Sequence, residues 1–393
     1  MSFSSTAKRI GSDRLKAAVR FVTVGVLTTA VTLSPAVSGN DAFLLSGSNM
    51  DWPSVIEESE DIRTGRFIPR KILISGVQMD ETRAYVTMPQ YMKTGVSWSL
   101  GVFRLDPMDF EPAIQPFPDY KYYGSCSDTC IVNVVAIFLE NGVLWALDSG
   151  KVNTIRRPIP LRPPQLLAID LKTDTVDRAI DLQPVTSSES TLQHIVAQRT
   201  LNGHLFVFIS DATRRKIIVY NVNADALHVV PLPEAMPPAA TTWNVMLHLF
   251  TVNKAGKSFV YFTYQKSPKL YALESWSNES IQFGSMVEIG LKPTAMVFFS
   301  SDGGTNVYFR LPHSTEVYAW DANTPLDIAN FRLVHRSYLY LTPTAVVAGW
   351  RDTLWSMESN YDEYVLCNVD CTGPRTLLRP VKTTVDDCDS YIL

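Results

Sequence analysis

A short run of β-branched and aromatic residues recurs six times along the chain, and this repeat constrains the fold more than any other feature. The six runs begin 47 to 63 residues apart, at Tyr85, Leu144, Val207, Val260, Val307 and Leu354. A second run follows each of them, as in Leu166–Asp170, Ile217–Tyr220 and Glu316–Trp320. Such residues favour pleated, half-buried strands, so the pattern predicts strand pairs, and no long apolar pattern has a helical period.

Each repeat is long enough for a four-stranded blade, since known blade repeats are about 40–50 residues long. Six units therefore favour an all-β, six-bladed β-propeller, in which radial closure leaves only short strand edges. A pair of two-sheet sandwiches with fortuitous spacing is the alternative. We expect one domain over residues 40–393. Within it, residues 40–66 would form an arm or edge strand, and the tail after Leu377 would return to close the ring.

The first 39 residues have the pattern of a signal peptide. Five basic side chains within residues 8–20 precede an apolar run from Phe21 to Leu33, and small residues at 36–39 supply a cleavage zone. An uncleaved anchor is the alternative, but the run is short for a span of about 20 residues. The sequence therefore predicts a secreted, extracellular protein with no membrane segment once the signal is removed.

The charge of the mature chain is acidic. Without residues 1–39 it has 30 Lys and Arg against 38 Asp and Glu, a formal charge of −8. This sign argues against nucleic acid or an anionic membrane as the main partner.

Five cysteines and one sequon fit an extracellular protein. In an oxidising compartment we expect one or two disulfides and one leftover thiol. The candidates for pairing are Cys126, Cys130, Cys367 and Cys371, and their spacing leaves local and long-range bridges open. Zinc binding is a weaker alternative, because no histidine or second CxxC accompanies the two CxxxC pairs. Asn278 begins the single glycosylation sequon.

Several segments resemble the insect yellow and major royal jelly protein family. They are Ile68–Ile72, Tyr85–Pro89, Gly95–Gly101, Leu144–Gly150, Pro163–Asp174, Ile209–Asp211 and Ile217–Val222. The resemblance covers most of residues 66–225 and implies the propeller fold. Two departures are Leu139–Gly142, which lacks a cysteine that the family commonly has there, and Ala319-Trp320, which replaces a Cys-Trp pair. Both put the family's usual disulfide pattern in doubt.

The resemblance implies a range of roles. Members of the family are associated with cuticle pigmentation and dopachrome conversion, with royal jelly nutrition, or with salivary binding of serotonin and catecholamines. Such variety ties the family to a fold more firmly than to one activity.

The residues themselves show no strong catalytic motif and no cofactor motif. GxSxG, HExxH, a Walker loop and CxxC are all absent from the sequence, so the catalytic residues are unknown. The six histidines (194, 204, 228, 248, 313 and 335) are scattered, and we interpret each as a surface or hydrogen-bonded structural residue.

Alignment of the six repeats suggests a ligand site at one rim of the central channel. If the recurring strands are the innermost ones, their ends gather there. The candidate residues are Trp98, Asp148, Ser210, Asp211, Thr263, Tyr264, Tyr308, Arg310 and Glu358. Carboxylates and aromatic faces suit a small aromatic amine such as serotonin or a catecholamine. Arg310 would repel such a cation, and Asp148 and Asp211 also fit a simpler role as turn caps.

Three other functions use the same geometry. The main alternative is a dopachrome-converting enzyme of the pigmentation pathway, which needs a positioned acid and base. A calcium-dependent lactonase would use oxygen ligands from Asp148, Asp211, Glu358 and Asn360. The last is a structural or nutritive protein without a ligand. Trp145, Trp355, Tyr261 and Phe309 alternate with the rim positions and are predicted to pack between blades.

Overall fold

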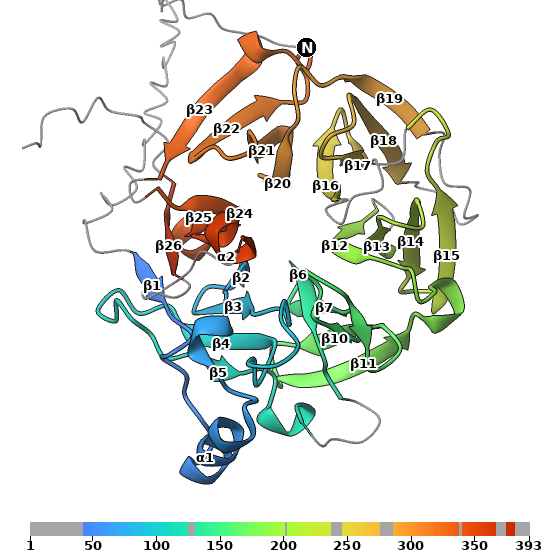
Figure 1. Cartoon of the computed structure of the whole chain (residues 1–393). Coiled ribbons are helices and arrows are strands. Elements are labelled where there is room, and N and C mark those ends of the chain that lie inside the picture. Colours follow the sequence, from blue (N-terminus) through green and yellow to red (C-terminus); the bar gives the residue numbers. More distant parts are fainter. Residues whose placement is uncertain are drawn as a thin grey trace, which may run out of the picture. The chain divides into compact units, whose positions relative to one another are not determined.

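Six four-stranded antiparallel sheets surround one axis and form a six-bladed β-propeller, as the repeat predicted (Figure 1). The computed structural model describes residues 42–124, 130–200, 203–236, 246–275, 286–337, 340–366 and 375–381. The predicted signal peptide, Cys126, Cys367, Cys371, Cys388 and Asn278 lie outside the described residues.

The strands of each blade run from the axis outward in chain order, except in the last blade. The first three blades contain β2 (Gly76–Met79), β3 (Arg83–Thr87), β4 (Leu100–Arg104) and β5 (Gln115–Pro116); β6 (Val134–Glu140), β7 (Val143–Asp148), β10 (Gln165–Asp170) and β11 (Thr175–Asp181); and β12 (Leu192–Arg199), β13 (Leu205–Asp211), β14 (Lys216–Asn221) and β15 (Ala226–Pro231). The other three contain β16 (Leu247–Lys254), β17 (Lys257–Tyr264), β18 (Lys269–Ser275) and β19 (Met286–Leu291); β20 (Val297–Ser301), β21 (Asn306–Arg310), β22 (Glu316–Asp321) and β23 (Phe331–Arg336); and β24 (Thr342–Gly349), β25 (Thr353–Ser359), β26 (Thr376–Pro380) and β1 (Phe43–Leu45).

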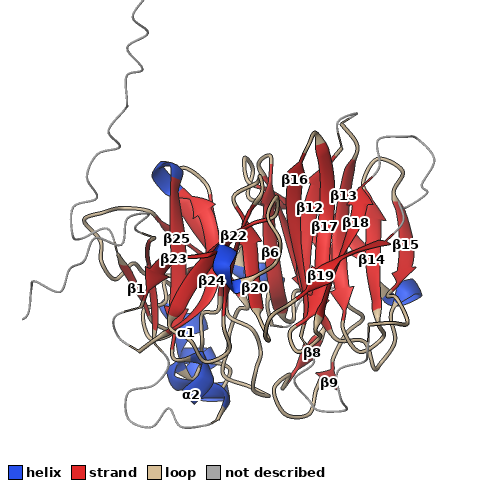
Figure 2. Cartoon of the chain, turned by 90° about the horizontal axis from the view of Figure 1, so that it is seen from above, coloured by secondary structure: helices blue, strands red, loops and turns tan. Residues whose placement is uncertain are grey.

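Short elements connect the strands at the ends of the blades (Figure 2). They are the helices α1 (Val55–Thr64) and α2 (Tyr361–Val365), the small hairpin β8 (Lys151–Val152) and β9 (Ile159–Pro160), and the 3-10 turns Pro69–Lys71, Gln183–Val185, Tyr120–Tyr122, Ile328–Asn330 and Trp350–Asp352. No helix among the described residues is long and apolar enough to cross a membrane.

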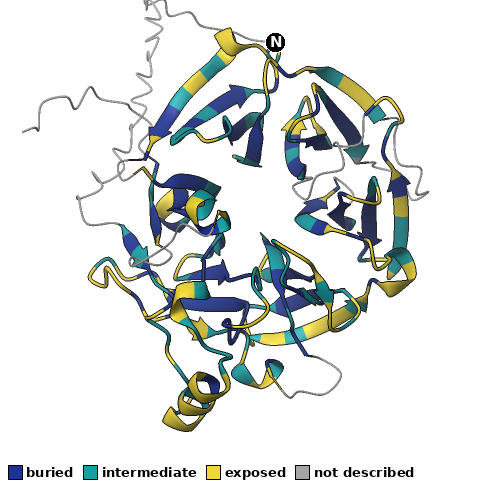
Figure 3. Ribbon diagram, viewed as in Figure 1, coloured by how far each residue is buried: buried dark blue, intermediate teal, exposed yellow. Residues whose placement is uncertain are grey.

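The second strand of each blade forms the centre of the packing between blades (Figure 3). Along β7, Leu144 and Ala146 belong to one apolar cluster, whereas Trp145 and Leu147 belong to another. Alternate side chains therefore face opposite neighbouring blades, as the period of a strand requires. The outermost strand β11 has mostly exposed side chains, because only one of its faces meets protein. The predicted packing role of Trp145 is thus confirmed.

The N-terminal strand closes the ring. β1 pairs antiparallel with β26 as the outer strand of the last blade, with Phe43 opposite Leu378. Two hydrogen bonds also join the last blade to the first, from Tyr364 Oη to Lys71 O at 2.7 Å and from Thr376 Oγ1 to Ile74 O at 2.9 Å. The segment predicted as an arm or edge strand therefore supplies the closing strand.

Candidate functional site

The strands that stood out in the sequence are the second strands of their blades, not the innermost ones. Asp148 ends β7 and lies opposite Val134 of the inner strand β6, and Asp211 ends β13 opposite Leu192 of β12. The expectation that these strands line the axis is wrong, because each lies one strand farther from the axis. Second strands are buried on both faces and so have the most continuous apolar pattern, whereas polar residues interrupt the inner strands.

Asp148 is held entirely by protein donors. Its Oδ1 accepts the backbone N–H groups of Asn133 at 2.8 Å and Gly150 at 2.9 Å. Its Oδ2 accepts the N–H of Val132 at 2.9 Å and the Gln165 amide at 3.1 Å. The carboxylate is buried, and its contacts are those of a turn cap.

Asp211 has the equivalent role in the next blade. Its Oδ1 accepts the N–H of Thr191 at 3.0 Å, its Oδ2 accepts the Ser190 hydroxyl at 2.6 Å, and Lys216 Nζ lies 3.8 Å from Oδ2. The side chain has no exposed surface.

Glu358 is likewise buried within a set of polar partners. His335 Nε2, Arg379 Nε at 3.1 Å and Ser337 Oγ at 2.5 Å surround its two oxygens. Asn360, the other candidate calcium ligand, accepts the N–H of Arg375 at 2.8 Å. Among the described residues, no group of three or more His, Cys, Asp or Glu side chains is arranged to hold a metal ion.

The predicted hydroxyl groups support the backbone. Ser210 Oγ accepts the N–H of His194 at 2.9 Å, and Thr263 Oγ1 donates to Lys269 O at 2.7 Å. Tyr264 Oη donates to Ala212 O at 2.6 Å, which links two blades. Burial, as the main cause, raises the pKa of Tyr264 to about 12.

Two of the three predicted aromatic faces, Trp98 and Tyr308, lie in apolar packing. Trp98 precedes β4, and its ring centroid lies 4.7 Å from Trp52 and 6.0 Å from Tyr120. Tyr308 belongs to an apolar cluster with Val317 and Val346.

Two histidines lie one strand closer to the axis, at the starts of neighbouring inner strands. His194 is on β12, at a bulge between Leu192 and Ile195, and His248 is on β16 opposite Thr263. The ring centroids of the two histidines are 5.0 Å apart. Bulges change the direction in which side chains point and are common next to active sites.

Both imidazoles are neutral at physiological pH. Burial lowers the pKa of His194 from 6.5 to about 4. The pKa of His248 lies well below 6.5, mainly because of burial and then because His194, Lys292 and Arg310 are nearby basic groups, while the backbone of Phe298 acts in the opposite direction. Nδ1 of His194 and both ring nitrogens of His248 lack a hydrogen-bond partner in the part of the chain that the structure describes. These nitrogens are buried, and no described side chain or backbone group satisfies them with good hydrogen-bond geometry.

Two cationic side chains lie close to the histidines. Lys292, between β19 and β20, donates from Nζ to Tyr264 O at 2.7 Å and to Gln265 O at 2.9 Å. Burial lowers its pKa to about 7. Arg310 donates from Nε to Pro343 O at 2.9 Å, and burial also lowers its pKa. Arg310 is thus a predicted rim residue whose charge acts on His248.

Aromatic residues gather at the same end of the axis, around α2. The ring of Tyr91 lies 6.0 Å from Tyr361 and 5.9 Å from Tyr364. Tyr361 and Asp362 act electrostatically on Arg310, which places α2 near the basic residues.

We call His194, His248, Lys292 and Arg310 the basic cluster.

The sequence interpretation missed His194 and His248 because it treated every histidine as structural. A usable signal was present: His194 and His248 precede Ser210 and Thr263 by 16 and 15 residues, offsets that differ by one residue in adjacent repeats. In each blade the most apolar strand is the second one. Polar residues at matching positions of the strand before it therefore indicate the strand that lines the central axis.

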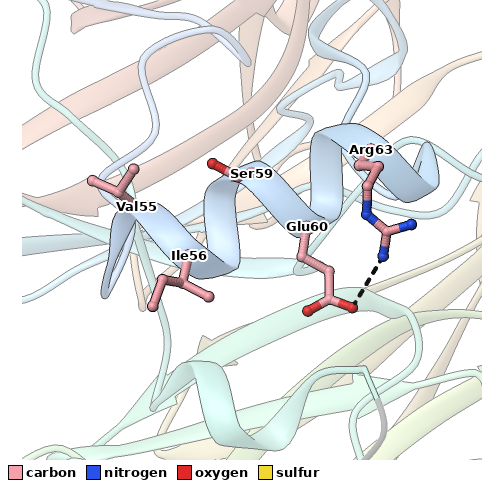
Figure 4. A pocket seen from close by; sticks show the side chains of 5 residues that line it. All are labelled: Val55, Ile56, Ser59, Glu60 and Arg63. Atoms are coloured by element: carbon pink, nitrogen blue, oxygen red, sulfur yellow. Dashed lines mark ion pairs between the residues drawn. The ribbon is translucent and has the colours of Figure 1, made fainter.

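A surface feature on α1 is separate from this site. Val55, Ile56, Ser59, Glu60 and Arg63 lie along one exposed side of the helix, where Arg63 and Glu60 form an ion pair at 3.6 Å (Figure 4). The ion pair joins exposed side chains and adds little stability.

The family follows from a match over most of the blades. The family model described as Major royal jelly protein matches residues 136–379, from β6 to β26. The chain belongs to the major royal jelly protein family. The resemblance seen in the sequence is thereby confirmed.

Proteins similar to this chain carry different names. Dopaminechrome tautomerase of Drosophila melanogaster is 23% identical over 72% of this chain and 68% of its own length. Protein yellow of Drosophila yakuba is 23% identical over 93% of this chain and 74% of that protein. Major royal jelly protein 1 of Apis mellifera is 28% identical over 45% of this chain and 42% of that protein.

Proposed function

We propose that this chain is a tautomerase that acts on a small quinoid compound of the aminochrome type, and that the basic cluster is its site. The observation that carries the proposal is the pair of neutral, unpartnered imidazoles on adjacent inner strands. A relative named for action on dopaminechrome supports the choice of substrate class. The dopachrome-converting alternative drawn from the sequence belongs to the same class of reaction.

Tautomerisation of such a compound moves a proton from a ring carbon to a quinone oxygen. It needs a base and an acid but no oxidant. Of two neutral imidazoles, one accepts the carbon proton at its free nitrogen and the other donates its N–H proton to the oxygen. The two rings are neighbours, so a proton passed between them restores both. Arg310 stabilises negative charge that develops on the oxygen.

The test is a dopaminechrome conversion assay with matched histidine variants. His248→Gln and His194→Gln should each lower kcat/KM by about 100-fold or more, the usual range for a lost acid or base. His204→Gln is the control, because His204 lies in the turn between β12 and β13 at the other end of the propeller. Conversion no faster than in buffer, or full activity in both site variants, would contradict the proposal.

Binding of a small aromatic amine, the first expectation from the sequence, is the second candidate function. Tyr91 and Tyr361 supply aromatic faces near α2, and the side chain of Asp362 is 35% exposed at the same end. The basic cluster disfavours a cation, so an amine would bind at the α2 side. Titration with serotonin and dopamine tests this function, with Asp362→Asn as the variant. Saturable heat that weakens in the variant supports it, and an absence of heat with folded protein excludes it.

We also propose that the protein is secreted, as its sequence pattern indicates and as its family suggests. Expression of the full chain in insect cells should release protein that lacks about the first 39 residues. N-terminal sequencing of the medium and of the cell fraction decides between secretion and retention, and the same material shows whether Asn278 is glycosylated and how the cysteines pair.

A further inference from the structure

We propose that Lys292 is a nucleophilic amine that forms an imine with a carbonyl group of a small ligand. The inference rests on the proposed function only in one respect, which is that both place a small ligand at the same site. It adds a covalent step that proton transfer by the histidines does not require.

The hydrogen bonds of Lys292 fit a neutral amine. Its Nζ donates to two backbone carbonyls, Tyr264 O at 2.7 Å and Gln265 O at 2.9 Å. An ammonium group has three N–H donors, whereas a neutral amine has two and a lone pair. The described residues offer Nζ these two acceptors and no ion pair with a carboxylate. The neutral form is therefore fully satisfied, and its lone pair points away from both carbonyls.

The surroundings of Lys292 disfavour a positive charge. The side chain is 5% exposed, and burial removes the water that would solvate an ammonium group. The nearby ionisable groups that act on the same cluster, His248 and Arg310, are also basic. Desolvation in apolar surroundings is one way in which a lysine becomes an amine that attacks carbonyl compounds.

A purely structural role explains Lys292 less well. Tyr264 O also accepts the N–H of Ser267 at 3.0 Å, and Gln265 O accepts the N–H of Met296 at 3.4 Å. Both carbonyls therefore keep a partner when Nζ moves. The amine can turn toward a ligand without leaving a buried carbonyl unpaired.

The chemistry is balanced without a co-reactant. The amine lone pair attacks the carbonyl carbon, and a proton moves from nitrogen to oxygen to give a carbinolamine. Loss of one water molecule then forms the C=N bond, and hydrolysis reverses the step. Quinones, ketones and aldehydes all provide the required carbonyl group.

The experiment traps the imine in the full-length protein. Protein at pH 7 is treated with 4-hydroxybenzaldehyde and cyanoborohydride, which reduces an imine to a stable secondary amine, and labelled lysines are located by peptide mass spectrometry. Lys257, 60% exposed on β17, is the internal control. Because about half of Lys292 and well under a hundredth of a surface lysine is neutral at pH 7, Lys292 should be labelled at least tenfold faster.

The outcomes separate this inference from the proposed function. Labelling of Lys292 no faster than Lys257, in protein with a native melting curve, overturns the inference even if dopaminechrome is converted. Rapid labelling that dopaminechrome slows supports both. Rapid labelling without any conversion supports the imine and rejects the tautomerase. Lys292→Met should lose the label, and a label that stays at the same rate on another residue rejects the assignment to Lys292.

Discussion

Charged and polar side chains inside this propeller divide into two groups according to their hydrogen bonds. Asp148, Asp211 and Glu358 are saturated by protein donors and stabilise the ends of second strands. His194 and His248 lie closer to the axis and have ring nitrogens without a partner among the described residues. A buried polar atom that lacks a partner lowers stability, so the second group is the better candidate for a role in binding or catalysis.

At the residue scale, the bonds of Asp211 predict a loss of stability rather than a loss of ligand contact. Asp211→Ala removes the carboxylate that accepts from Ser190 and Thr191 and lies near Lys216, and should lower the free energy of unfolding by about 3 kcal/mol. Asp177→Ala, whose side chain is 68% exposed, should stay within about 0.5 kcal/mol. Urea unfolding measures both. Weaker amine binding by Asp211→Ala at unchanged stability would instead place Asp211 in a ligand site.

The lowered histidine pKa values predict acid sensitivity, also at the residue scale. The unfolded chain binds protons to these histidines near pH 6.5, but folded His194 does so only near pH 4. Stability is therefore complete above pH 6.5 and falls as the pH drops toward 4, by at most about 3 kcal/mol for one such group. His248→Leu should flatten this slope, as followed by chemical unfolding at several pH values. An identical slope in the variant would show that His248 is not buried in its neutral form.

At the scale of elements, the sequence pattern located one strand of each blade correctly and assigned it the wrong place. Runs such as Leu144–Asp148 are apolar on both faces, which is the signature of a strand with blades on either side. Inner strands such as β12 mix buried apolar residues with Gln193 and His194 and are interrupted by bulges, so they lack a clear period. The fold was therefore predictable from local patterns, whereas the site depends on which strand faces the axis.

The turn after β7 provides a prediction at this scale. Gly150 has φ +64°, and an added Cβ would lie 2.2 Å from Arg162 O. Gly142 has φ +75° with nothing within 4 Å of its Cβ position. Gly142→Ala should therefore cost about 1 kcal/mol of backbone strain, and Gly150→Ala should cost clearly more, about 3 kcal/mol, because backbone must move as well. Equal thermal shifts for the two variants would show that the β8–β9 hairpin adapts freely.

At the scale of the whole molecule, stability depends on the seam where the ring closes. β1 comes from the start of the described chain and β26 from its end, so their pairing joins distant parts of the sequence. Contacts of long sequence separation form only after a large loss of chain entropy, and closure is therefore expected late in folding.

Phe43 tests this seam because its ring contacts both the first and the last blade. Its centroid lies 5.6 Å from Phe103 on β4, 6.0 Å from Trp350 and 5.9 Å from Trp355 on β25. Phe43→Ala removes a side chain that is 1% exposed and should lower the free energy of unfolding by about 3–5 kcal/mol. Phe110→Ala, at a residue that is 52% exposed, should change it by less than about 1 kcal/mol. If closure holds all six blades together, the Phe43 variant unfolds in one transition at lower denaturant. An additional transition at low denaturant, with the midpoint of the main transition unchanged, would instead show that the last blade opens independently while the other five stay folded.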